Sequence, residues 1–359
     1  MFVSDFDYDV PPDLIATKAI QPRSAAKMLV IRRKSSHSPF QDSTFLHLPQ
    51  YLKRGDLLVT NDTHVIPALF FAKRTTGAQL EGLYLGPTES ECIQVWLKGK
   101  VVSGERIQLE DGRYVEVVAR HEKEAILNVS ESAFRSYLDV HGRVPLPPYI
   151  RREREKRAED EGSCDEEDYQ TMFSQRNSLI SVAAPTASLH FDAELLQSLE
   201  LAGVERLSVS LGVGAGTFAP LENEALEKNQ LHREPVRIPP SAWTRVTEQR
   251  ARGGRVIAVG TTVTRALESA ALRTERGESP EDFYTDLFIY PPYSFRVVDG
   301  LITNFHWPKS SLLAMVSAFL SGGSGSEKNS LAPSWRDVYD YAIRNQYRLF
   351  SYGDGMFIE

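Results

Sequence analysis

The chain has 359 residues, a length that suggests roughly two or three domains and suffices to bury a large core. Its 41 basic and 48 acidic residues give a formal net charge of −7 at pH 7. This balance excludes a polybasic chain that binds nucleic acid by charge density alone, but it does not exclude a local basic patch. Hydrophobic residues at 42% and charged residues at 25% exclude wholesale disorder.

Cysteine, histidine and apolar patterns exclude further classes. The two cysteines, Cys92 and Cys164, form no CxxC pair, which excludes a cysteine-ligated zinc site and argues against a disulfide framework. No HExxH string or histidine pair at metal-ligand spacing occurs, so we predict no metal. The acidic N-terminus lacks the features of a secretory signal, and the longest apolar run, Ser310 to Leu320, is too short to span a bilayer. We therefore expect a soluble cytoplasmic protein with no membrane partner.

The first elements in chain order are two strands and a β-rich module. The segment up to residue 62 predicts strands at Lys27 to Arg32 and Leu57 to Thr60, with a short helix and a turn between them. From residue 63 to residue 145, short β-rich runs are separated by turn signals such as Thr76-Gly77. This spacing predicts a small antiparallel sandwich or barrel.

Two charge blocks follow this module. Residues 151–157 carry five positive and two negative charges, and residues 158–168 carry seven negative charges. Blocks of opposite sign indicate an exposed, solvated segment. The alternative is that the basic half contacts phosphate through Arg151, Arg152 and Arg154.

From Tyr169 onward, strands and helices alternate. A helix is predicted from Phe191 to Ala202 with Asp192 as its N-cap, and the alternation continues through the strings RVIAVG, DLFIY and LITNF. The predicted fold class is therefore α/β. A discontinuous main domain (1–62 and 146–359) would carry residues 63–145 as an inserted small antiparallel β-barrel domain.

A glycine-rich loop is the first candidate ligand site. The string SLGVGAGTF places Gly212, Gly214 and Gly216 after a strand, where backbone N–H groups can approach an anion or a ring closely. The spacing is not GxGxxG and no Walker lysine follows, so a plain turn is the alternative.

A strand-to-helix turn is the second candidate. In VIAVGTTVTRALESAA the strand ends at Gly260, and Thr261 and Thr262 begin a helix. In open α/β sheets ligands bind at the carboxyl ends of strands, and a helix N-terminus with threonine hydroxyls suits a carboxylate or phosphate. The alternative is simple N-capping. Farther along the helix, Arg265 and Glu268 are one turn apart, and the alternative to a role in the site is an intrahelical pair between them.

Three of the eight histidines lie in contexts that suit a site. His190 precedes a predicted helix among apolar residues, His306 follows a buried strand, and His232 lies beside Arg233. A neutral imidazole near pH 7 is the natural general acid or base, and the alternative for each is a satisfied core group. No GxSxG elbow or kinase signature occurs.

The C-terminal tail is rich in aromatic residues. A free tail would expose Tyr347, Phe350 and Tyr352, so we expect it to dock on the body. Whether Asp354 is a turn residue or a site carboxylate stays open at this point.

Nine long strings stand out in chain order: DFDYDVPPDLIA, GDLLVTNDTHVIPA, PLPPYI, DYQTMF, VAAPTASLHF, GVGAGTF, GGRVIAVGTTVTRALESAA, VVDGLITNFHWPKSSLLAMVSAF and YRLFSYGDGM. From the first residues to the last, they resemble the S-adenosylmethionine:tRNA ribosyltransferase-isomerase family of queuosine biosynthesis. The resemblance implies an α/β domain with an inserted β-barrel. It also implies transfer of the ribosyl group of S-adenosylmethionine to 7-aminomethyl-7-deazaguanine at the tRNA wobble position. Isomerisation would give epoxyqueuosine and release adenine and methionine.

The resemblance also suggests roles for the candidate residues. S-adenosylmethionine is a substrate, tRNA is the partner, and no cofactor is expected. His190 and His306 are the acid or base candidates, and His232 is a weaker one. The candidate substrate-binding residues are Asn61, Asp62, Thr186, Gly214, Gly216, Thr217, Thr261, Thr262, Arg265, Asn304 and Asp354.

Within this set, the turn at Thr261 and Thr262, with Arg265, would bind an anionic group, and the glycine-rich loop would pack against the nucleoside. A local basic patch formed by Arg151, Arg152 and Arg154 would contact the tRNA with a modest salt dependence. A second basic cluster lies at residues 32–34.

The chain departs from the family pattern at several positions. The family usually has histidine where Gly212 stands, and arginine where His64 and Leu69 stand. Neither His64 nor Leu69 can replace the bidentate contacts of a guanidinium. These departures support an alternative: a divergent paralogue of the same fold with an altered substrate, or a non-catalytic scaffold that binds RNA or protein.

Overall fold

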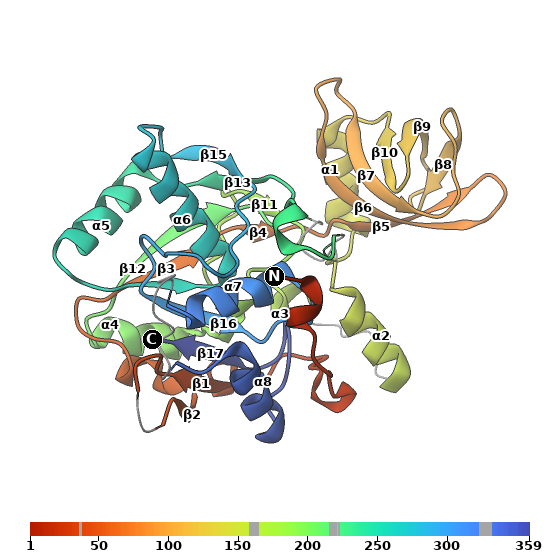
Figure 1. The fold of residues 1–359 in the computed structure, drawn as a ribbon. Helices are drawn as coiled ribbons and strands as arrows, with labels where there is room; N and C mark the ends of the chain where they lie inside the picture. The colour runs from red at the N-terminus through yellow and green to blue at the C-terminus, as the bar shows by residue number, and fades with distance from the viewer. Residues whose placement is uncertain (36–37, 158–164, 215–220, 222, 323–331) are drawn as a thin grey trace.

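The computed structural model describes residues 1–35, 38–157, 165–214, 221, 223–322 and 332–359. They form a large α/β body and a β-barrel that projects from one side of it (Figure 1). The predicted fold class, α/β with an inserted antiparallel barrel, is confirmed. All barrel strands lie between residues 63 and 145, and the domain boundaries themselves stay a prediction.

A nine-stranded sheet with the order β15-β13-β12-β3-β14-β16-β17-β1-β2 forms the centre of the body. Its strands are β1 (Lys27–Ile31), β2 (Phe40–Thr44), β3 (Leu57–Asn61), β12 (Glu205–Leu211), β13 (Glu234–Arg237), β14 (Val256–Val259), β15 (Asp282–Thr285), β16 (Gly300–Asn304) and β17 (Gly355–Ile358). β12, β3, β14 and β16 are parallel to one another, whereas β17 is antiparallel to β16. The carboxyl ends of the four parallel strands therefore meet at one edge of the sheet.

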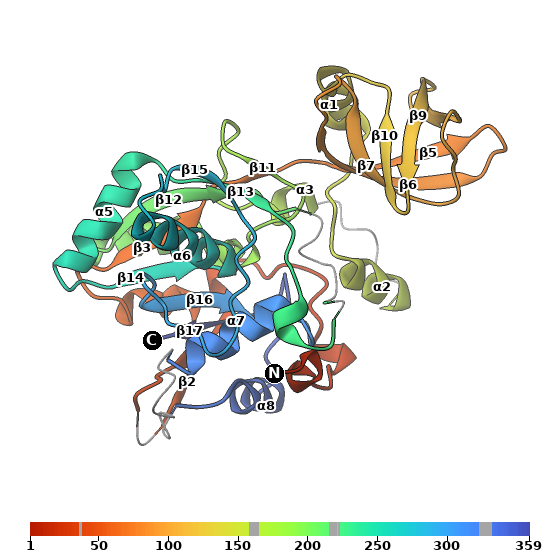
Figure 2. The same cartoon turned by 45° about the horizontal axis from the view of Figure 1, so that its top comes forward.

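Helices cover both faces of this sheet. On one face lie α5 (Pro240–Ala251), α6 (Thr261–Glu275), α7 (Ser311–Leu320) and α8 (Trp335–Arg344), and on the other lies α4 (Ala193–Leu201). The remaining helices are α1 (Glu131–His141), which packs on the barrel, α2 (Pro148–Arg157) and α3 (Asp165–Asp168). Short 3-10 helices are η1 (Val3–Phe6), η2 (Pro12–Leu14), η3 (Arg23–Ala25), η4 (Phe45–Gln50), η5 (Thr186–His190) and η7 (Leu226–Lys228). Figure 2 shows α5 and α6 lying over β12 and β14.

Strand alternation supplies two cores, one on each face. In β1, Leu29 and Ile31 join the core that contains residues of α6, α7 and α8, while Met28 and Val30 join the core that contains residues of α4. The central strands β3, β14 and β16 are buried along their whole length, as strands covered on both faces are. The predicted N-cap of α4 is confirmed, because the carboxylate of Asp192 accepts the N–H of Leu195 at 3.0 Å.

The projecting module is a closed barrel of six antiparallel strands in the order β10-β7-β6-β5-β8-β9. Its strands are β5 (Leu69–Arg74), β6 (Gln79–Pro87), β7 (Ile93–Lys98), β8 (Arg106–Leu109), β9 (Tyr114–His121) and β10 (Glu124–Leu127). Alternate side chains fill the interior, such as Leu80 and Tyr84 of β6. Helix α1, which is not among the elements predicted from the sequence, adds Phe134 and Leu138 to this core.

A short two-stranded sheet and an ion pair join the barrel to the body. β4 (His64–Val65) pairs in parallel with β11 (Ile180–Ser181). Arg151 of α2 binds Glu81 of β6 with N–O distances of 3.0 and 3.2 Å. Residues 151–157 form most of α2. The predicted exposure is found at four of them, Arg152, Glu155, Lys156 and Arg157, whereas Glu153 and Arg154 are buried. Residues 158–164 of the acidic block lie outside the described residues.

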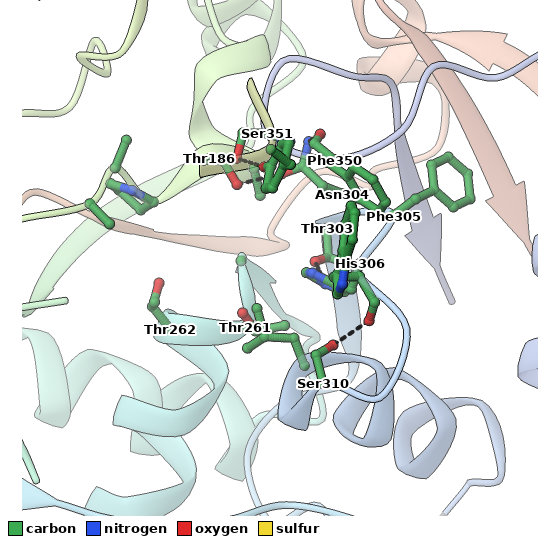
Figure 3. Close-up of a pocket in the computed structure, with 18 of the residues that line it drawn as sticks. Thr186, Thr261, Thr262, Thr303, Asn304, Phe305, His306, Ser310, Phe350 and Ser351 are labelled. Carbon is green, nitrogen blue, oxygen red and sulfur yellow. Dashed lines mark hydrogen bonds between the residues drawn. The ribbon is translucent and has the colours of Figure 1, made fainter. Parts of the chain in front are cut away.

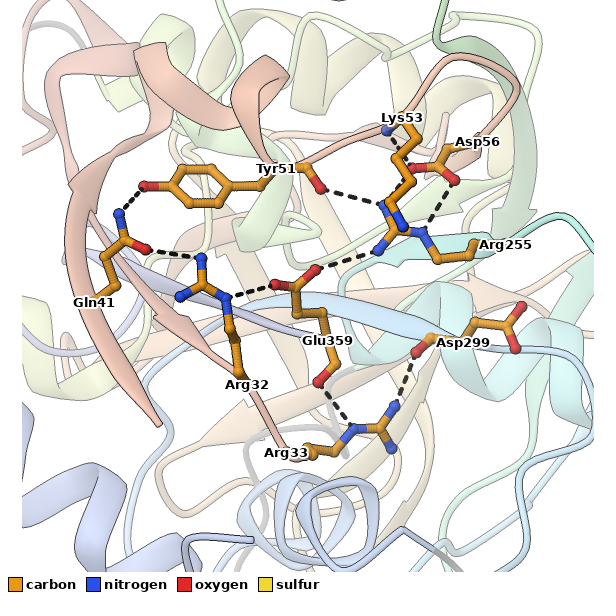
Figure 4. Close-up of polar contacts among 9 residues, drawn as sticks. All are labelled: Arg32, Arg33, Gln41, Tyr51, Lys53, Asp56, Arg255, Asp299 and Glu359. Atoms are coloured by element: carbon orange, nitrogen blue, oxygen red, sulfur yellow. Dashed lines mark hydrogen bonds and ion pairs between the residues drawn. The ribbon is translucent and has the colours of Figure 1, made fainter. Parts of the chain in front are cut away.

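Charged side chains close the sheet edge at the amino ends of the parallel strands (Figure 4). The carboxylate of Glu359 accepts hydrogen bonds from Arg32 and Arg255, both at 3.2 Å. Arg33 donates to the carbonyl oxygen of Asp299 at 3.0 Å. Two arginines of the second basic cluster are thus bound within the protein, at the edge opposite the carboxyl ends of β3, β14 and β16.

The C-terminal tail is built into the body more deeply than the sequence suggests. The predicted docking is confirmed, because Tyr347, Phe350 and Tyr352 are buried and β17 lies between β16 and β1. The strand expected at the string DLFIY lies just before it, at β15, and residues 286–290 belong to no helix or strand. Among the described helices, none combines the length and the apolar character needed to cross a membrane.

Candidate active site

A pocket of about 440 Å³ lies at the carboxyl edge of the parallel strands (Figure 3). Residues that follow β14 form one wall, from Gly260 to Thr262, and residues at the end of β16 form another. η5, the start of α2 and the tail before β17 also contribute to the lining. Ligands of open α/β sheets bind outside the carboxyl ends of parallel strands, and this is where the sequence analysis expected them.

Two predicted binding residues meet on the polar wall of the pocket. The hydroxyl of Thr186, the first residue of η5, donates to Oδ1 of Asn304 at 2.9 Å. Nδ2 of Asn304 donates to the carbonyl oxygen of Phe350 at 3.2 Å. These bonds fix the amide plane of Asn304 at the point where η5, β16 and the tail converge.

His190 lies behind Asn304 and does not line the pocket. Its Nε2 accepts a hydrogen bond from Nδ2 of Asn304 at 3.1 Å, and its ring stacks on Phe45 with centroids 4.0 Å apart. Burial lowers the pKa of His190 to about 3, and the charge of Arg348 acts in the same direction. The structure therefore supports the alternative of a satisfied core histidine.

His306 is the one predicted histidine that lines the pocket among the described residues. The ring nitrogen Nε2 of His306 is 2.8 Å from the hydroxyl oxygen of Thr303. The backbone N–H of His306 donates to the hydroxyl of Tyr339 at 2.7 Å. Burial lowers the pKa of His306 to about 3. Because acid–base catalysis works best with a pKa near the operating pH, this ring is suited to act as a neutral hydrogen-bonding group.

The N-terminus of α6 faces the pocket. Gly260 turns the chain from β14 into the helix with a φ of 98°, which glycine adopts without strain. Thr261 and Thr262 follow as the first two helical residues, and both line the pocket. The first N–H groups of a helix have no partner within it, and together with the helix dipole they favour an anionic ligand group.

Three aromatic side chains form a further wall, which we call the aromatic wall: Tyr149, Trp307 and Phe350. Tyr149 and Trp307 are stacked, with centroids 5.4 Å apart and 14° between the ring planes, and Phe350 lies 4.6 Å from the Trp307 ring. The hydroxyl of Tyr149 is 2.5 Å from Oγ of Ser351, which fixes the ring. Phe350 has a φ of 72°, a left-handed conformation that costs a non-glycine residue about 1–3 kcal/mol.

Arg265 is engaged inside the protein, although it was predicted to bind an anionic ligand group. Its guanidinium forms a buried ion pair with Glu234 and donates to the carbonyl oxygen of Leu287 at 3.1 Å. Glu268 accepts hydrogen bonds from the N–H groups of residues 296–298, and burial raises its pKa. The alternative of an intrahelical pair is therefore wrong, because each side chain has another partner.

Three other predicted residues lie outside the pocket lining and form hydrogen bonds with other segments of the chain. Asn61 exchanges two hydrogen bonds with the backbone of Leu211, at 3.0 and 3.2 Å, which link the ends of β3 and β12. Asp62 accepts hydrogen bonds from two serine hydroxyls, both at 2.6 Å. Asp354 is buried and accepts from the guanidinium of Arg348 at 3.2 Å. For Asp354 the structure thus favours a role in tail docking over a site carboxylate.

The three candidate tRNA-contacting arginines have different environments. Arg152 is exposed and lines the rim of the pocket. Arg151 is held by its ion pair with Glu81. Arg154 is buried and bonds to the carboxylate of Asp165 at 2.6 and 2.8 Å. The guanidinium of Arg154 is thus bound within the protein, and its contact with tRNA stays a prediction.

The remaining predicted residues lie apart from the pocket or outside the described residues. The N–H of Gly214 donates to the carboxylate of Glu234 at 3.1 Å. Gly216 and Thr217 fall outside the described residues. His232 is exposed on the segment before β13, so the structure does not bring the three candidate histidines together.

Of the positions that depart from the family pattern, Gly212 and Leu69 are buried and His64 is half-buried. A side chain at Gly212 would place its Cβ 2.9 Å from a carbonyl oxygen of β11 and 3.0 Å from the ring of Pro235. His64 bonds through Nδ1 to the hydroxyl of Ser174 at 2.9 Å, and Leu69 is buried at the start of β5. A Cβ at position 212 would therefore require the backbone of β11 or the ring of Pro235 to shift.

The aromatic wall is the part of the pocket that sequence reasoning missed. Its members come from three segments of the chain, in the strings PPYI, FHWP and RLFS. Of these, only FHWP carried a usable signal, since an aromatic residue that directly follows a buried strand lies at the ligand-binding edge. In the part of the chain that the structure describes, no group of three or more histidine, cysteine, aspartate and glutamate side chains is placed to hold a metal.

Comparison with known proteins gives matches over the whole chain. A family model described as "Queuosine biosynthesis protein" matches residues 3–358. The S-adenosylmethionine:tRNA ribosyltransferase-isomerase of Ralstonia nicotianae is 41% identical over 99% of this chain and 95% of its own length. The enzyme of the same name from a Sulfurihydrogenibium species is 38% identical over 100% of both chains.

A solved structure agrees with these relatives. The crystal structure of S-adenosylmethionine tRNA ribosyltransferase from Thermotoga maritima is 29% identical, covers 99% of this chain and 100% of its own, and aligns with a TM-score of 0.53. The resemblance seen in the motifs is thus confirmed. Because the family model spans nearly every residue and the relatives align from end to end, the chain belongs to the queuosine biosynthesis protein family.

Proposed function

We propose that this protein is an S-adenosylmethionine:tRNA ribosyltransferase-isomerase. It transfers the ribosyl group of S-adenosylmethionine to 7-aminomethyl-7-deazaguanine at the tRNA wobble position and isomerises it, which gives epoxyqueuosine and releases adenine and methionine. The observation that carries the proposal is the identity of 38–41% to two enzymes of that name along essentially the whole chain. S-adenosylmethionine is a substrate that is consumed, and no cofactor is part of the proposal. Because the partner is tRNA, we place the reaction in the cytoplasm.

The pocket at the carboxyl edge of the sheet offers two complementary walls for this substrate. The N-terminus of α6, with Thr261 and Thr262, suits the carboxylate of the methionine group. The pair formed by Thr186 and Asn304 offers a hydroxyl and an amide to the ribose or the adenine. A pocket of about 440 Å³ lies within the size range of small-molecule sites.

The reaction breaks the bond from ribose to adenine and the bond from ribose to sulfur, and the leaving adenine must gain a proton. Burial keeps His306 neutral near pH 7, so its role in the proposal is to hydrogen-bond the substrate or a water at the reacting centre. His190 acts one step farther away, because it positions Asn304. We assign no direct role to His232.

The test is to incubate the protein with S-adenosylmethionine and a tRNA that carries 7-aminomethyl-7-deazaguanine, then to measure adenine release and the mass of the wobble nucleoside. The matched control is the same tRNA with guanine at the wobble position. The proposal expects adenine and an epoxyqueuosine mass only with the modified tRNA. Binding of S-adenosylmethionine without either product would favour the alternative of a paralogue with another substrate. Absence of any binding would favour the scaffold.

A further inference from the structure

The aromatic wall combines a fixed geometry with access to solvent. Tyr149 is held by its 2.5 Å contact to Ser351, and it stacks on Trp307. Trp307 is nevertheless 39% exposed, although its ring is one of the largest apolar side chains in the protein. Phe350 packs against both rings, with centroids 5.1 and 4.6 Å away. Exposed aromatic surface favours association with a partner. A partly exposed aromatic wall at the pocket therefore indicates that a ligand binds there.

A charged side chain lies on the same side of the pocket. Arg152 follows Tyr149 by three residues in α2, so the two side chains project from the same face of the helix, and both line the pocket. Arg152 is exposed and donates to the carbonyl oxygen of Pro148 in its own helix at 3.4 Å. A guanidinium has five N–H donors, so an exposed arginine with this bond can also bind a phosphate.

We propose that Trp307, supported from behind by Tyr149 and the buried Phe350, is a stacking platform for a nucleobase of the tRNA substrate, and that Arg152 binds a flanking phosphate. This inference rests on the proposed function and deepens it. Proteins that read unpaired RNA loops stack the exposed bases on aromatic side chains and hold the backbone with basic ones. The anticodon loop, which contains the wobble position, is such an unpaired segment.

The position of the platform favours tRNA over S-adenosylmethionine. A base that belongs to a polymer must enter from solvent, and Trp307 and Arg152 are both exposed where they line the pocket. The proposal assigns the one anionic group of S-adenosylmethionine, its carboxylate, to the N-terminus of α6, so the arginine beside the stack is left for a phosphate of the tRNA. The buried polar groups, Thr186, Asn304 and the start of α6, are left for the smaller substrate.

The experiment compares wild-type protein with Trp307→Ala, Trp307→Phe and Arg152→Ala. The matched control is Tyr284→Ala, which removes an aromatic ring that is 61% exposed on β15, away from the pocket. Binding of an anticodon stem-loop RNA is measured by fluorescence anisotropy at several salt concentrations, and binding of S-adenosylmethionine by calorimetry. Both readouts work in the absence of turnover, so a protein that binds RNA on this platform but releases no adenine would refute the proposed function alone.

We expect Trp307→Ala to weaken RNA binding about 5- to 150-fold, the range for loss of one stacked base. Trp307→Phe should recover much of that loss, and in Trp307→Ala the affinity for RNA should fall by a larger factor than the affinity for S-adenosylmethionine. Arg152→Ala should lower the magnitude of the salt slope by about 1, as expected for one phosphate contact. Tyr284→Ala should bind as wild type does.

Three results would overturn the inference. If Trp307→Ala weakened only the binding of S-adenosylmethionine, the wall would hold its adenine instead. If neither affinity changed, the wall would not be a binding surface. If Trp307→Ala and Trp307→Phe each lowered the affinities for RNA and for S-adenosylmethionine by the same factor, the tryptophan would stabilise the pocket as a whole. It would then not stack on a base of the RNA.

Discussion

Asn304 donates from its Nδ2 to Nε2 of His190 at 3.1 Å, which joins an amide of the pocket wall to an imidazole in the core. Because Nε2 accepts this bond, the ring is neutral and carries its proton on Nδ1. Oδ1 of the same Asn304 accepts from Thr186 at 2.9 Å. A chain of two hydrogen bonds thus runs from the core to the pocket, and the orientation of the amide is set before any substrate binds.

The buried, neutral state of His190 predicts acid sensitivity. Its pKa falls to about 3 in the folded protein from an ordinary value of 6.5, because burial disfavours the imidazolium. Between these values the unfolded chain binds a proton that the folded protein does not, so the stability is present above pH 6.5 and is lost as the pH falls. One such group contributes a slope of about 1.4 kcal/mol per pH unit to the free energy of unfolding.

The measurement is urea unfolding of wild type and His190→Gln at pH 7, 6 and 5. The variant should be less stable at pH 7, but its free energy of unfolding should fall less steeply with acid than that of wild type. His232→Gln is the matched control, because it removes an exposed imidazole and should keep the wild-type pH dependence. Parallel curves for wild type and His190→Gln would contradict a buried, neutral ring.

The bond from Thr186 predicts a selective effect on substrate binding. In Thr186→Val, Oδ1 of Asn304 loses its donor in a half-buried site, which should lower the free energy of unfolding by about 1 kcal/mol. The amide can then turn, so the affinity for S-adenosylmethionine should fall about 2- to 10-fold. Thr186→Ser keeps the hydroxyl and is the control. Calorimetry that gave equal affinities for the valine and serine variants would argue against this positioning role.

The ion pair of Arg265 predicts a stability defect rather than a binding defect. Arg265→Ala leaves the buried carboxylate of Glu234 without its guanidinium, which should cost about 3–5 kcal/mol. The double variant Arg265→Met with Glu234→Gln removes both charges and should recover part of the loss. Urea unfolding measures both effects. If Arg265→Ala had the free energy of unfolding of wild type but failed to bind S-adenosylmethionine, the result would support the anion-binding role predicted from the sequence.

The fold was largely predictable because its signals are local. Turn residues between short apolar runs indicated the barrel, and buried strands followed by helices indicated the sheet. The place of β17 between β16 and β1 was not predictable, since it depends on pairing over more than 300 residues with β1. The burial of Arg154 in the basic run of α2 was not predictable for a related reason. Asp165, the ion-pair partner that encloses Arg154, belongs to the acidic block that the charge pattern placed in solvent.

The site was predictable only in part. The strand-to-helix turn at Gly260 located the pocket edge correctly, because the carboxyl ends of parallel strands bind ligands whatever the rest of the fold does. The polarity of single residues was a poorer guide. Three polar residues of the matched motifs form hydrogen bonds or an ion pair with partners inside the protein: Asn61, Arg265 and Asp354. Such partners are distant in sequence, so only the structure separates them from pocket residues such as Thr186.

The contrast between Arg152 and Arg154 gives a last prediction, on stability as well as on RNA. Arg154 is enclosed by Asp165 and by the carbonyl oxygen of Thr17, so Arg154→Ala should lower the free energy of unfolding by about 3 kcal/mol. Arg152→Ala should leave unfolding unchanged, because its side chain is exposed. Arg344→Ala, an exposed arginine of α8, is the matched control for loss of one surface charge.

Binding of tRNA at several salt concentrations separates the two roles. Arg152→Ala should lose affinity most strongly at low salt, since a phosphate contact acts through counterion release. Arg154→Ala and Arg344→Ala should keep the wild-type salt slope wherever the protein is folded. The same loss of slope in Arg154→Ala as in Arg152→Ala would mean that α2 opens when tRNA binds and that its buried arginine reaches the phosphate backbone after all.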